Sequence, residues 1–160
     1  MGTGSAIYRI VELLHIVSAI VGFGGVITHG FYNAKAYAST AGEAGPILRA
    51  TQSVTNLAHF GFYGLFVFGI VLIPLSDSVH SFADPWISAA FLVIFAVIGI
   101  AHGLIRPTMR ALTARAEAVD PGTVLQNDPE VAGLAKKLAL GEGLTQLLLV
   151  VALVLMIWQF

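Results

Sequence analysis

Apolar residues run along this chain in four long segments, separated by short stretches rich in Gly, Pro, Asp and Glu. Each segment is long enough to cross a membrane, since a helix needs about 20 mainly apolar residues to span the hydrocarbon. The pattern predicts an all-α fold, a membrane four-helix bundle that forms a single transmembrane domain over residues 1–160. The predicted helices cover residues 7–37, 47–75, 85–112 and 131–158.

The connections between these segments carry residues that end or begin helices. Gly42 and Pro46 are expected to break the chain between the first two helices. Asp84 and Asp128 each precede a proline, which is the pattern of an N-cap followed by proline at the first helical position. Residues 114–127 are longer and polar, with an Asp-Pro-Gly turn near the middle, and are expected to form a mobile surface segment.

Composition supports a membrane protein and excludes several other classes. Hydrophobic residues make up 57% and charged residues 11% of the chain, against about 45–50% and 25% in soluble domains. The net charge of −1, with no basic cluster apart from the flanks of the apolar segments, predicts no nucleic-acid partner. The chain has no Cys, so disulfides and thiolate metal sites are excluded.

Lysine and arginine gather on one side of the predicted bundle, and only Arg9 lies on the other side. Because cytoplasmic loops carry an excess of these residues, we expect that side to face the cytoplasm. With four spans, both termini then lie outside, an N-out/C-out orientation. The residues on the basic side are Lys35, Arg49, Arg106, Arg110, Arg115, Lys136 and Lys137.

Polar and small residues recur at steps of three and four in each predicted helix, which places them on one face. Polar groups in a bilayer are expected to face the bundle interior, so each helix should present a polar inner stripe. The small residues of the first stripe leave room for a neighbouring helix or a flat cofactor. The stripes are His15, Ser18, Gly22, Gly25 and His29; Gln52, Asn56, His59 and Tyr63; Phe95, Gly99, His102 and Arg106; and Leu138, Glu142, Gln146 and Leu149.

Counting at about 1.5 Å per residue from the basic anchors estimates the depth of each polar group. Most of them fall within roughly 15 Å of the basic side and are expected to form one cluster. His15 lies at roughly 30 Å, near the opposite interface, and cannot share a compact site with His102. The expected cluster contains His29, Asn56, His59, His102, Glu142 and Gln146.

Three interpretations of this cluster stay open. Its members could serve only as hydrogen-bonded interhelical contacts, worth about 0.6 kcal/mol each. Neutral imidazoles on facing helices could ligate haem b, with His29 and His102 as the best pair by depth and His59 as an alternative partner. His15 would then belong to a second, outer site. A transition-metal or proton site could instead use His29, His59, His102 and Glu142, with Asn56 and Gln146 as polar support.

Short motifs resemble a broad group of small bacterial membrane proteins. Residues 12–25, ELLHIVSAIVGFGG, look like the first helix of this group, which includes copper-resistance-D-like proteins and the membrane protoporphyrinogen oxidase of the haem pathway. Residues 104–112, LIRPTMRAL, resemble the end of the third helix in an uncharacterised four-helix integral membrane family of the same group. Residues 128–131 and 147–158 resemble its last helix. The resemblance implies the bacterial cytoplasmic (inner) membrane.

The resemblance also bears on activity. In the oxidase branch a first-helix histidine, His15 here, is tied to haem binding and activity. That branch has a lysine shortly after the tryptophan that opens the third helix, but Trp86 here is followed by Ile, Ser, Ala and Ala. The missing lysine argues against oxidase activity, and the lack of Cys weakens copper transport. The uncharacterised family fits best.

The sequence therefore predicts a small, non-enzymatic membrane subunit that binds haem b through buried histidines. Its expected role is electron transfer or support of a larger membrane complex, or of a homo-oligomer. Two alternatives remain: a transporter of metal ions or protons, and an accessory subunit without a ligand.

Overall fold

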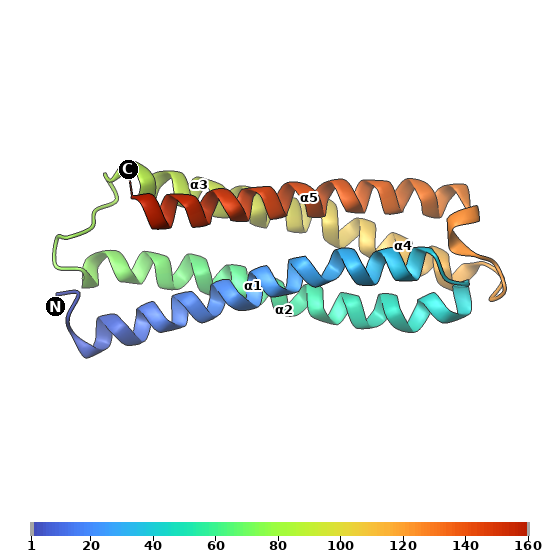
Figure 1. Cartoon of the computed structure of the whole chain (residues 1–160), viewed down its shortest axis with the longest axis horizontal. Coiled ribbons are helices and arrows are strands. Elements are labelled where there is room, and N and C mark those ends of the chain that lie inside the picture. Colours follow the sequence, from blue (N-terminus) through green and yellow to red (C-terminus); the bar gives the residue numbers. More distant parts are fainter. Residues whose placement is uncertain (1, 160) are drawn as a thin grey trace.

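The computed structural model describes residues 2–159, which form an elongated bundle of helices (Figure 1). Four helical stretches are long and apolar enough to cross a membrane, which confirms the all-α four-helix membrane bundle. The third of them runs unbroken from Pro85 to Ala118. The elements are α1 (Ala6–Tyr37), α2 (Ala41–Leu75), α3 (Pro85–Ile100), the π-helical turn η1 (Ala101–Ile105), α4 (Arg106–Ala118), the 3-10 turn η2 (Leu125–Asn127) and α5 (Pro129–Trp158).

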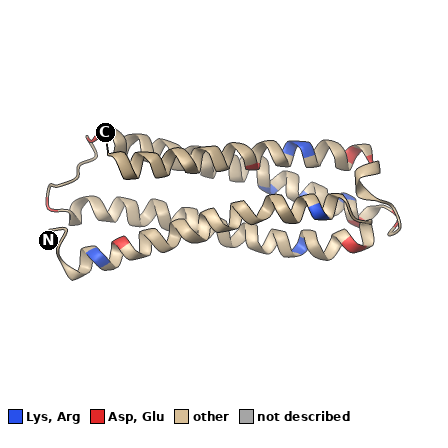
Figure 2. Cartoon of the chain, in the orientation of Figure 1, with Lys and Arg blue, Asp and Glu red and all other residues tan. Residues whose placement is uncertain are grey.

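Both termini lie at the same end of the bundle, as four spans require (Figure 1). We name this the terminal end. Apart from Arg9, the Lys and Arg positions lie in the other half (Figure 2). We name that end, with Lys35, Arg49, Arg115, Lys136 and Lys137, the basic end. That the basic end faces the cytoplasm stays a prediction from the charge bias.

The second helix begins earlier than predicted. The sequence placed its start at residue 47, whereas α2 begins at Ala41 and includes both Gly42 and Pro46. The cause is a cap at Thr40, whose backbone N–H donates to Glu43 Oε2 at 3.3 Å, one of the two contacts of a capping box. The cap outweighs the helix-breaking tendency of glycine and proline at this position.

The prediction of a mobile surface segment at residues 114–127 is wrong for two reasons. Helix α4 continues to Ala118, and the remaining residues are docked on the start of α2. The backbone N–H of Ala41 donates to Thr123 O at 2.8 Å, which satisfies a donor that the first turn of a helix leaves unpaired. Leu125 is only 1% exposed. Hydrogen bonds and apolar burial together fix this segment.

Two apolar cores lie along the bundle. One is near the basic end, and the other lies between the helices farther toward the terminal end. The spans of 30 to 35 residues are about 50 Å long, which exceeds a hydrocarbon layer of about 30 Å. Because the charged residues gather at the basic end, we expect that end to project from the hydrocarbon. Its core includes Leu48, Met109, Leu125, Val131 and Leu138; the other contains Val26, Phe62, Ile94, Val97 and Leu149.

Helices α1 and α2 touch along a seam of glycines. A Cβ added at Gly25 would lie 2.5 Å from the Cβ of Ala58, and one added at Gly61 would lie 2.5 Å from Gly22 N. Such close backbone approach is the usual role of small residues between membrane helices. The space left by these glycines is filled by the neighbouring helix, so a flat cofactor does not fit there.

Asp128 fastens the start of α5 to α4. Its Oδ1 accepts from the backbone N–H groups of Glu130 and Val131 at 3.0 Å, and Arg115 Nη2 donates to its Oδ2 at 2.7 Å. The predicted N-cap is thus confirmed. The hydrogen bond from Arg115, and then that from Val131, lower the pKa of Asp128 below its ordinary value.

This shift predicts how stability depends on pH. Because the folded-state pKa is the lower one, the contribution of Asp128 is complete above its unfolded-state pKa and is lost as pH falls through the folded-state pKa. Asp128→Asn is therefore expected to melt at a lower temperature than the native chain at pH 7, and this difference should shrink toward pH 3. Thermal melting between pH 3 and 8 measures this, with Glu117→Gln as the control. A constant difference at all pH values would contradict the role of the carboxylate.

Candidate functional site

The first polar group inside the bundle joins α1, α2 and α5. His29 Nε2 lies 3.0 Å from Thr55 Oγ1, and His29 Nδ1 lies 3.9 Å from Glu142 Oε1. Asn33 Nδ2 donates to the same carboxylate oxygen at 2.7 Å. His29 and Glu142 are 2% and 4% exposed. We call these two residues the His29–Glu142 pair.

The hydrogen bonds of Thr55 indicate which nitrogen of His29 carries the proton. Thr55 Oγ1 donates its only hydrogen to the backbone oxygen of Thr51 at 2.9 Å. His29 Nε2–H must then be the donor to Thr55 Oγ1, which leaves Nδ1 as the lone-pair nitrogen of the neutral ring. Nδ1 faces Glu142, so a single proton can reside on either member of the His29–Glu142 pair.

The second polar group lies between α2 and the third span. The rings of His59 and His102 are stacked with centroids 5.4 Å apart and an interplanar angle of 18°. Tyr63 Oη is hydrogen-bonded to His102 Nε2. Arg106 Nη1 approaches His102 Nδ1 at 3.4 Å, and its Nη2 donates to Asn56 Oδ1 at 3.3 Å. Since Arg only donates, His102 Nδ1 accepts and Nε2 carries the proton.

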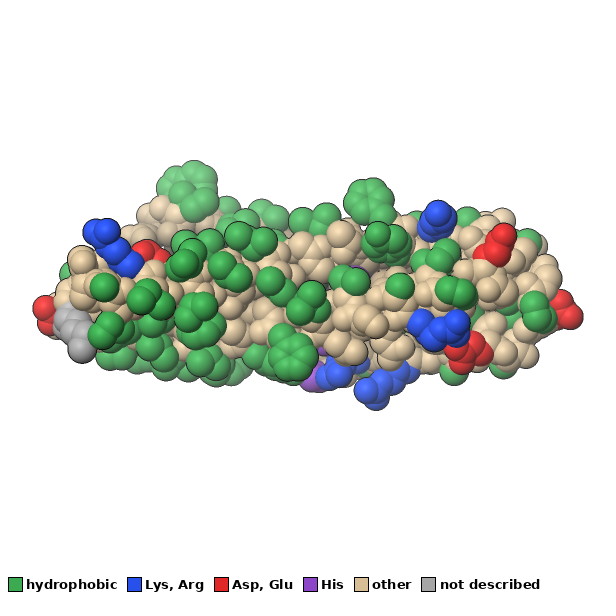
Figure 3. Space-filling model, turned by 90° about the horizontal axis from the view of Figure 1, so that it is seen from below, with side chains coloured by type: hydrophobic (Ala, Val, Ile, Leu, Met, Phe, Trp, Pro, Cys, Tyr) green, Lys and Arg blue, Asp and Glu red, His purple; other side chains and the backbone are tan. Residues whose placement is uncertain are grey.

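His59 and His102 differ in their surroundings. His59 is 6% exposed, and its buried Nδ1 has no hydrogen-bond partner among the described residues. His102 is exposed at the surface of its span. Figure 3 shows histidine at the surface of one face, beside Lys or Arg side chains and next to hydrophobic ones. An unpartnered buried nitrogen therefore lies beside an accessible imidazole.

The inner stripe predicted for the third helix is wrong. Phe95 is 56% exposed and His102 is exposed, whereas Ile94, Val97 and Ala101 are buried. The reason is that α3 packs its aliphatic face against α5 and turns the predicted stripe outward. The second predicted stripe is also partly outward, since Asn56 and Tyr63 are exposed.

A π-helical turn surrounds His102. The backbone N–H of Arg106 donates to Ala101 O, five residues back, in place of the usual four. Pro107 explains the location, because it has no N–H for the carbonyl of Gly103 and its ring crowds that carbonyl in an ordinary helix. Such turns occur frequently at functional sites.

The other predicted residues lie apart from these groups or support them. His15 lies toward the terminal end beside α2, where a Cβ added at Gly69 would be 3.3 Å from its Cε1. The buried Nδ1 of His15 has no hydrogen-bond partner among residues 2–159. Gln146 Nε2 donates to Val26 O at 3.4 Å and so joins α5 to α1. Sequence reasoning missed Asn33, although its spacing of four from His29 is a usable signal.

The four predicted metal ligands separate into two groups, because His29 contacts Glu142 while His59 contacts His102. Within the described part of the chain, no three His, Asp or Glu side chains come together as a metal-binding group. A haem iron, in contrast, needs only one or two imidazoles from the protein.

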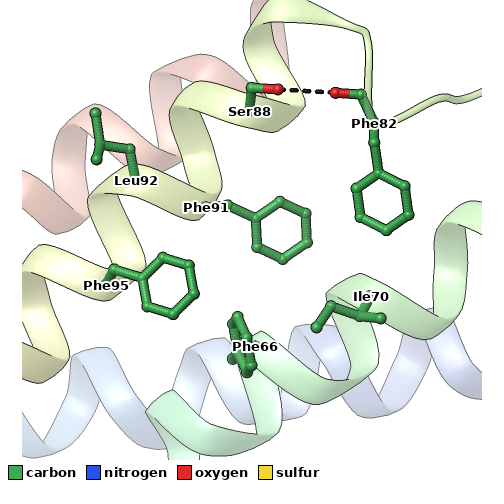
Figure 4. Close-up of a pocket in the computed structure, with 7 residues that line it drawn as sticks. All are labelled: Phe66, Ile70, Phe82, Ser88, Phe91, Leu92 and Phe95. Carbon is green, nitrogen blue, oxygen red and sulfur yellow. Dashed lines mark hydrogen bonds between the residues drawn. The ribbon is translucent and has the colours of Figure 1, made fainter.

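Two cavities lie on the same side of the bundle, between α2 and the third span. The larger, of about 460 Å³, is apolar and lies toward the terminal end (Figure 4). The smaller, of about 70 Å³, is polar and lies between α2 and α4. The larger is lined by Phe66, Ile70, Phe82, Ser88, Phe91, Leu92 and Phe95, and the smaller by Gln52, Thr55, Asn56, Arg106, Met109 and Arg110.

Comparison with known proteins identifies a family. The profile of the family described as "Predicted integral membrane protein (DUF2269)" matches residues 9–160. No curated protein and no solved structure matches the chain. The family match covers nearly the whole sequence, and its description agrees with the four apolar helices. The chain therefore belongs to the DUF2269 family of predicted integral membrane proteins.

Proposed function

We propose that this chain is a small membrane subunit that binds haem b on the α2/α3 side of the bundle. Its role would be electron transfer or support of a larger membrane complex or homo-oligomer in a bacterial inner membrane. The observation that carries the proposal is the pairing of His59, whose buried Nδ1 has no partner among the described residues, with the accessible His102. Haem, when bound, would supply one-electron redox chemistry.

Open space and aromatic side chains beside His102 support the proposal. A Cβ added at Gly99, one turn from His102, would meet no atom within 4 Å. Farther along this side, the space between α2 and α3 is lined by aromatic residues, and the ring centroids of Phe66 and Phe95 lie 5.0 Å apart. His59, through its unpartnered Nδ1, and His102 are the residues that would hold the iron, and His102 would have to exchange its hydrogen bond with Tyr63 or Arg106 for the iron. The pair expected from depth, His29 with His102, is less favoured because His29 is buried in the separate His29–Glu142 pair, where its lone-pair nitrogen Nδ1 faces the carboxylate at 3.9 Å.

A transporter is a weaker proposal. A path for protons or metal ions needs polar groups through the whole depth of the membrane. Toward the terminal end, however, the space between the helices is filled by an apolar core that contains Phe62, Val97 and Leu149. His15, the histidine of α1 in that half, is about 21 Å along the helix from His29. The polar groups thus extend across the bundle rather than through the membrane.

Absorption spectroscopy on the purified protein tests the haem proposal. We expect a Soret band after expression with sufficient haem or after reconstitution. His102→Ala should abolish the spectrum of an imidazole-ligated haem, because it removes the accessible ligand, and His59→Ala should alter it. His80→Ala is the matched control, since His80 packs on Trp86 in the loop at the terminal end.

Circular dichroism and thermal melting of each variant separate the loss of a ligand from the loss of the fold. Absence of any Soret band in folded native protein after reconstitution would overturn the proposal and favour an accessory subunit without a ligand. An unchanged spectrum in both folded His102→Ala and His59→Ala would reject this assignment of the ligands.

A further inference from the structure

The small polar cavity between α2 and α4 carries a charge that its surroundings do not neutralise. Arg106 donates toward His102 and Asn56, neither of which is acidic. Among residues 2–159, no carboxylate forms an ion pair with Arg106 or Arg110. In contrast, Arg49 on the same end of the bundle pairs with Glu117 at 3.0 Å. The cavity therefore lacks an anion that would balance two guanidinium groups.

The depth of this cavity matches that of lipid headgroups. The apolar run that precedes Arg106 covers residues 87–105 and is about 28 Å long at 1.5 Å per residue. This is close to the hydrocarbon thickness of about 30 Å, so Arg106 lies at the boundary where the headgroups begin. Arg110, one turn farther, extends into the headgroup layer.

We infer that this cavity binds the headgroup of an anionic phospholipid from the leaflet at the basic end. The planar guanidinium groups of Arg106 and Arg110 are suited to a phosphate, to which Arg can donate two parallel hydrogen bonds. Gln52 and Asn56 add neutral polar groups to the lining. The exposed position of Arg110 and Asn56 leaves the cavity open to the bilayer.

The same side of the bundle accommodates an acyl chain. Phe95 precedes Arg106 by three helical turns, about 16 Å, which is close to the depth of one leaflet. The apolar cavity of about 460 Å³ begins at this depth with Phe66 and Phe95 and extends toward the terminal end, so the tail of an acyl chain from this leaflet would reach its near edge (Figure 4). The order of arginine pocket and then aromatic cavity follows the order of phosphate and acyl chain in a phospholipid. A haem against Phe66 and Phe95 would compete with this acyl chain, so the inference is made for the haem-free protein and does not depend on haem binding.

Native mass spectrometry of the haem-free protein in detergent tests this inference. Phosphatidylglycerol should bind more tightly than phosphatidylcholine with the same acyl chains, because only the first carries a net negative charge. Loss of two Arg near a membrane surface weakens lipid attraction by about thirtyfold. We therefore expect Arg106→Gln/Arg110→Gln to bind phosphatidylglycerol about thirtyfold more weakly. Arg49→Gln, which removes a paired arginine from the same end, should bind normally.

Further measurements distinguish a phospholipid in the cavity from a free anion or a second copy of the chain. Inorganic phosphate at millimolar concentration should not displace the lipid, since it lacks the acyl chain; complete displacement would assign the cavity to a free anion and overturn the inference. Equal affinity for the two lipids, or normal phosphatidylglycerol binding by the folded double variant, would also overturn it. So would dimers that need both arginines and carry no lipid, because they would indicate a second copy as the occupant.

Discussion

Gly61→Ala is expected to destabilise the bundle by about 3 kcal/mol, the upper range for an overpacked interior. The added Cβ would lie 2.5 Å from Gly22 N, 2.8 Å from Ser18 O and 2.9 Å from Gly22 Cα. All three are backbone atoms, which cannot rotate away as a side chain does. To relieve these clashes, α1 and α2 would have to separate along their whole seam. This separation would remove the packing that holds membrane helices together.

Unfolding with increasing dodecyl sulfate in mixed micelles measures the effect, with helicity as the signal. Gly24→Ala is the matched control, because a Cβ there meets no atom within 4 Å and alanine favours the helix more than glycine does. The control should therefore be at least as stable as the native chain. Equal midpoints for Gly61→Ala and Gly24→Ala would show that the seam is looser than described.

Leu125→Ala is expected to lower the free energy of unfolding by about 3 kcal/mol and to release the segment that joins α4 to α5. Leu125 is 1% exposed and belongs to the core of the basic end. We expect this end to project from the hydrocarbon, and the loss then includes the transfer of apolar surface to water as well as the cavity left behind. The contacts of the segment with Ala41 should weaken together with it.

Hydrogen exchange of residues 119–128 and thermal melting report on these two effects. Leu140→Ala provides the control, since Leu140 is 71% exposed and its truncation should change stability by less than about 0.5 kcal/mol. If residues 119–128 exchange as fast in the native chain as in Leu125→Ala, the segment is not docked on α2. Equal melting temperatures for the two variants would refute the contribution of Leu125 to the core.

The sequence was most informative where polar residues interrupt an apolar helix. The spacing of His29 on the first helix and Glu142 on the last predicts the inner face of each, and both residues are buried. The third helix is different, because nearly every residue from 87 to 101 is apolar. Such a helix has no polar face to indicate its rotation, and packing of Ile94 and Val97 decides it instead.

Contacts between distant residues also escaped prediction. The start of α2 depends on Thr40, which pairs with Val124 across an isolated bridge. Local sequence shows glycine and proline at this place and says nothing of a partner 84 positions away. The stacking of His59 on His102 likewise follows from how α2 and the third span are rotated against each other. Spacing placed both residues in the half of the bundle near the basic side, but it favoured His29 as the partner of His102 and did not predict this contact.

The π-helical turn divides the third span into two helices, α3 and α4, whose packing faces are rotated relative to each other. The additional residue in one turn rotates everything after it by about 100° relative to an uninterrupted helix. Before the turn α3 packs against α5, and after it α4 packs against both α2 and α5. A single span can therefore present one face to the partner it needs within the lipid and another to the partners it needs in water. The two cores of this bundle can thus change in sequence independently of each other.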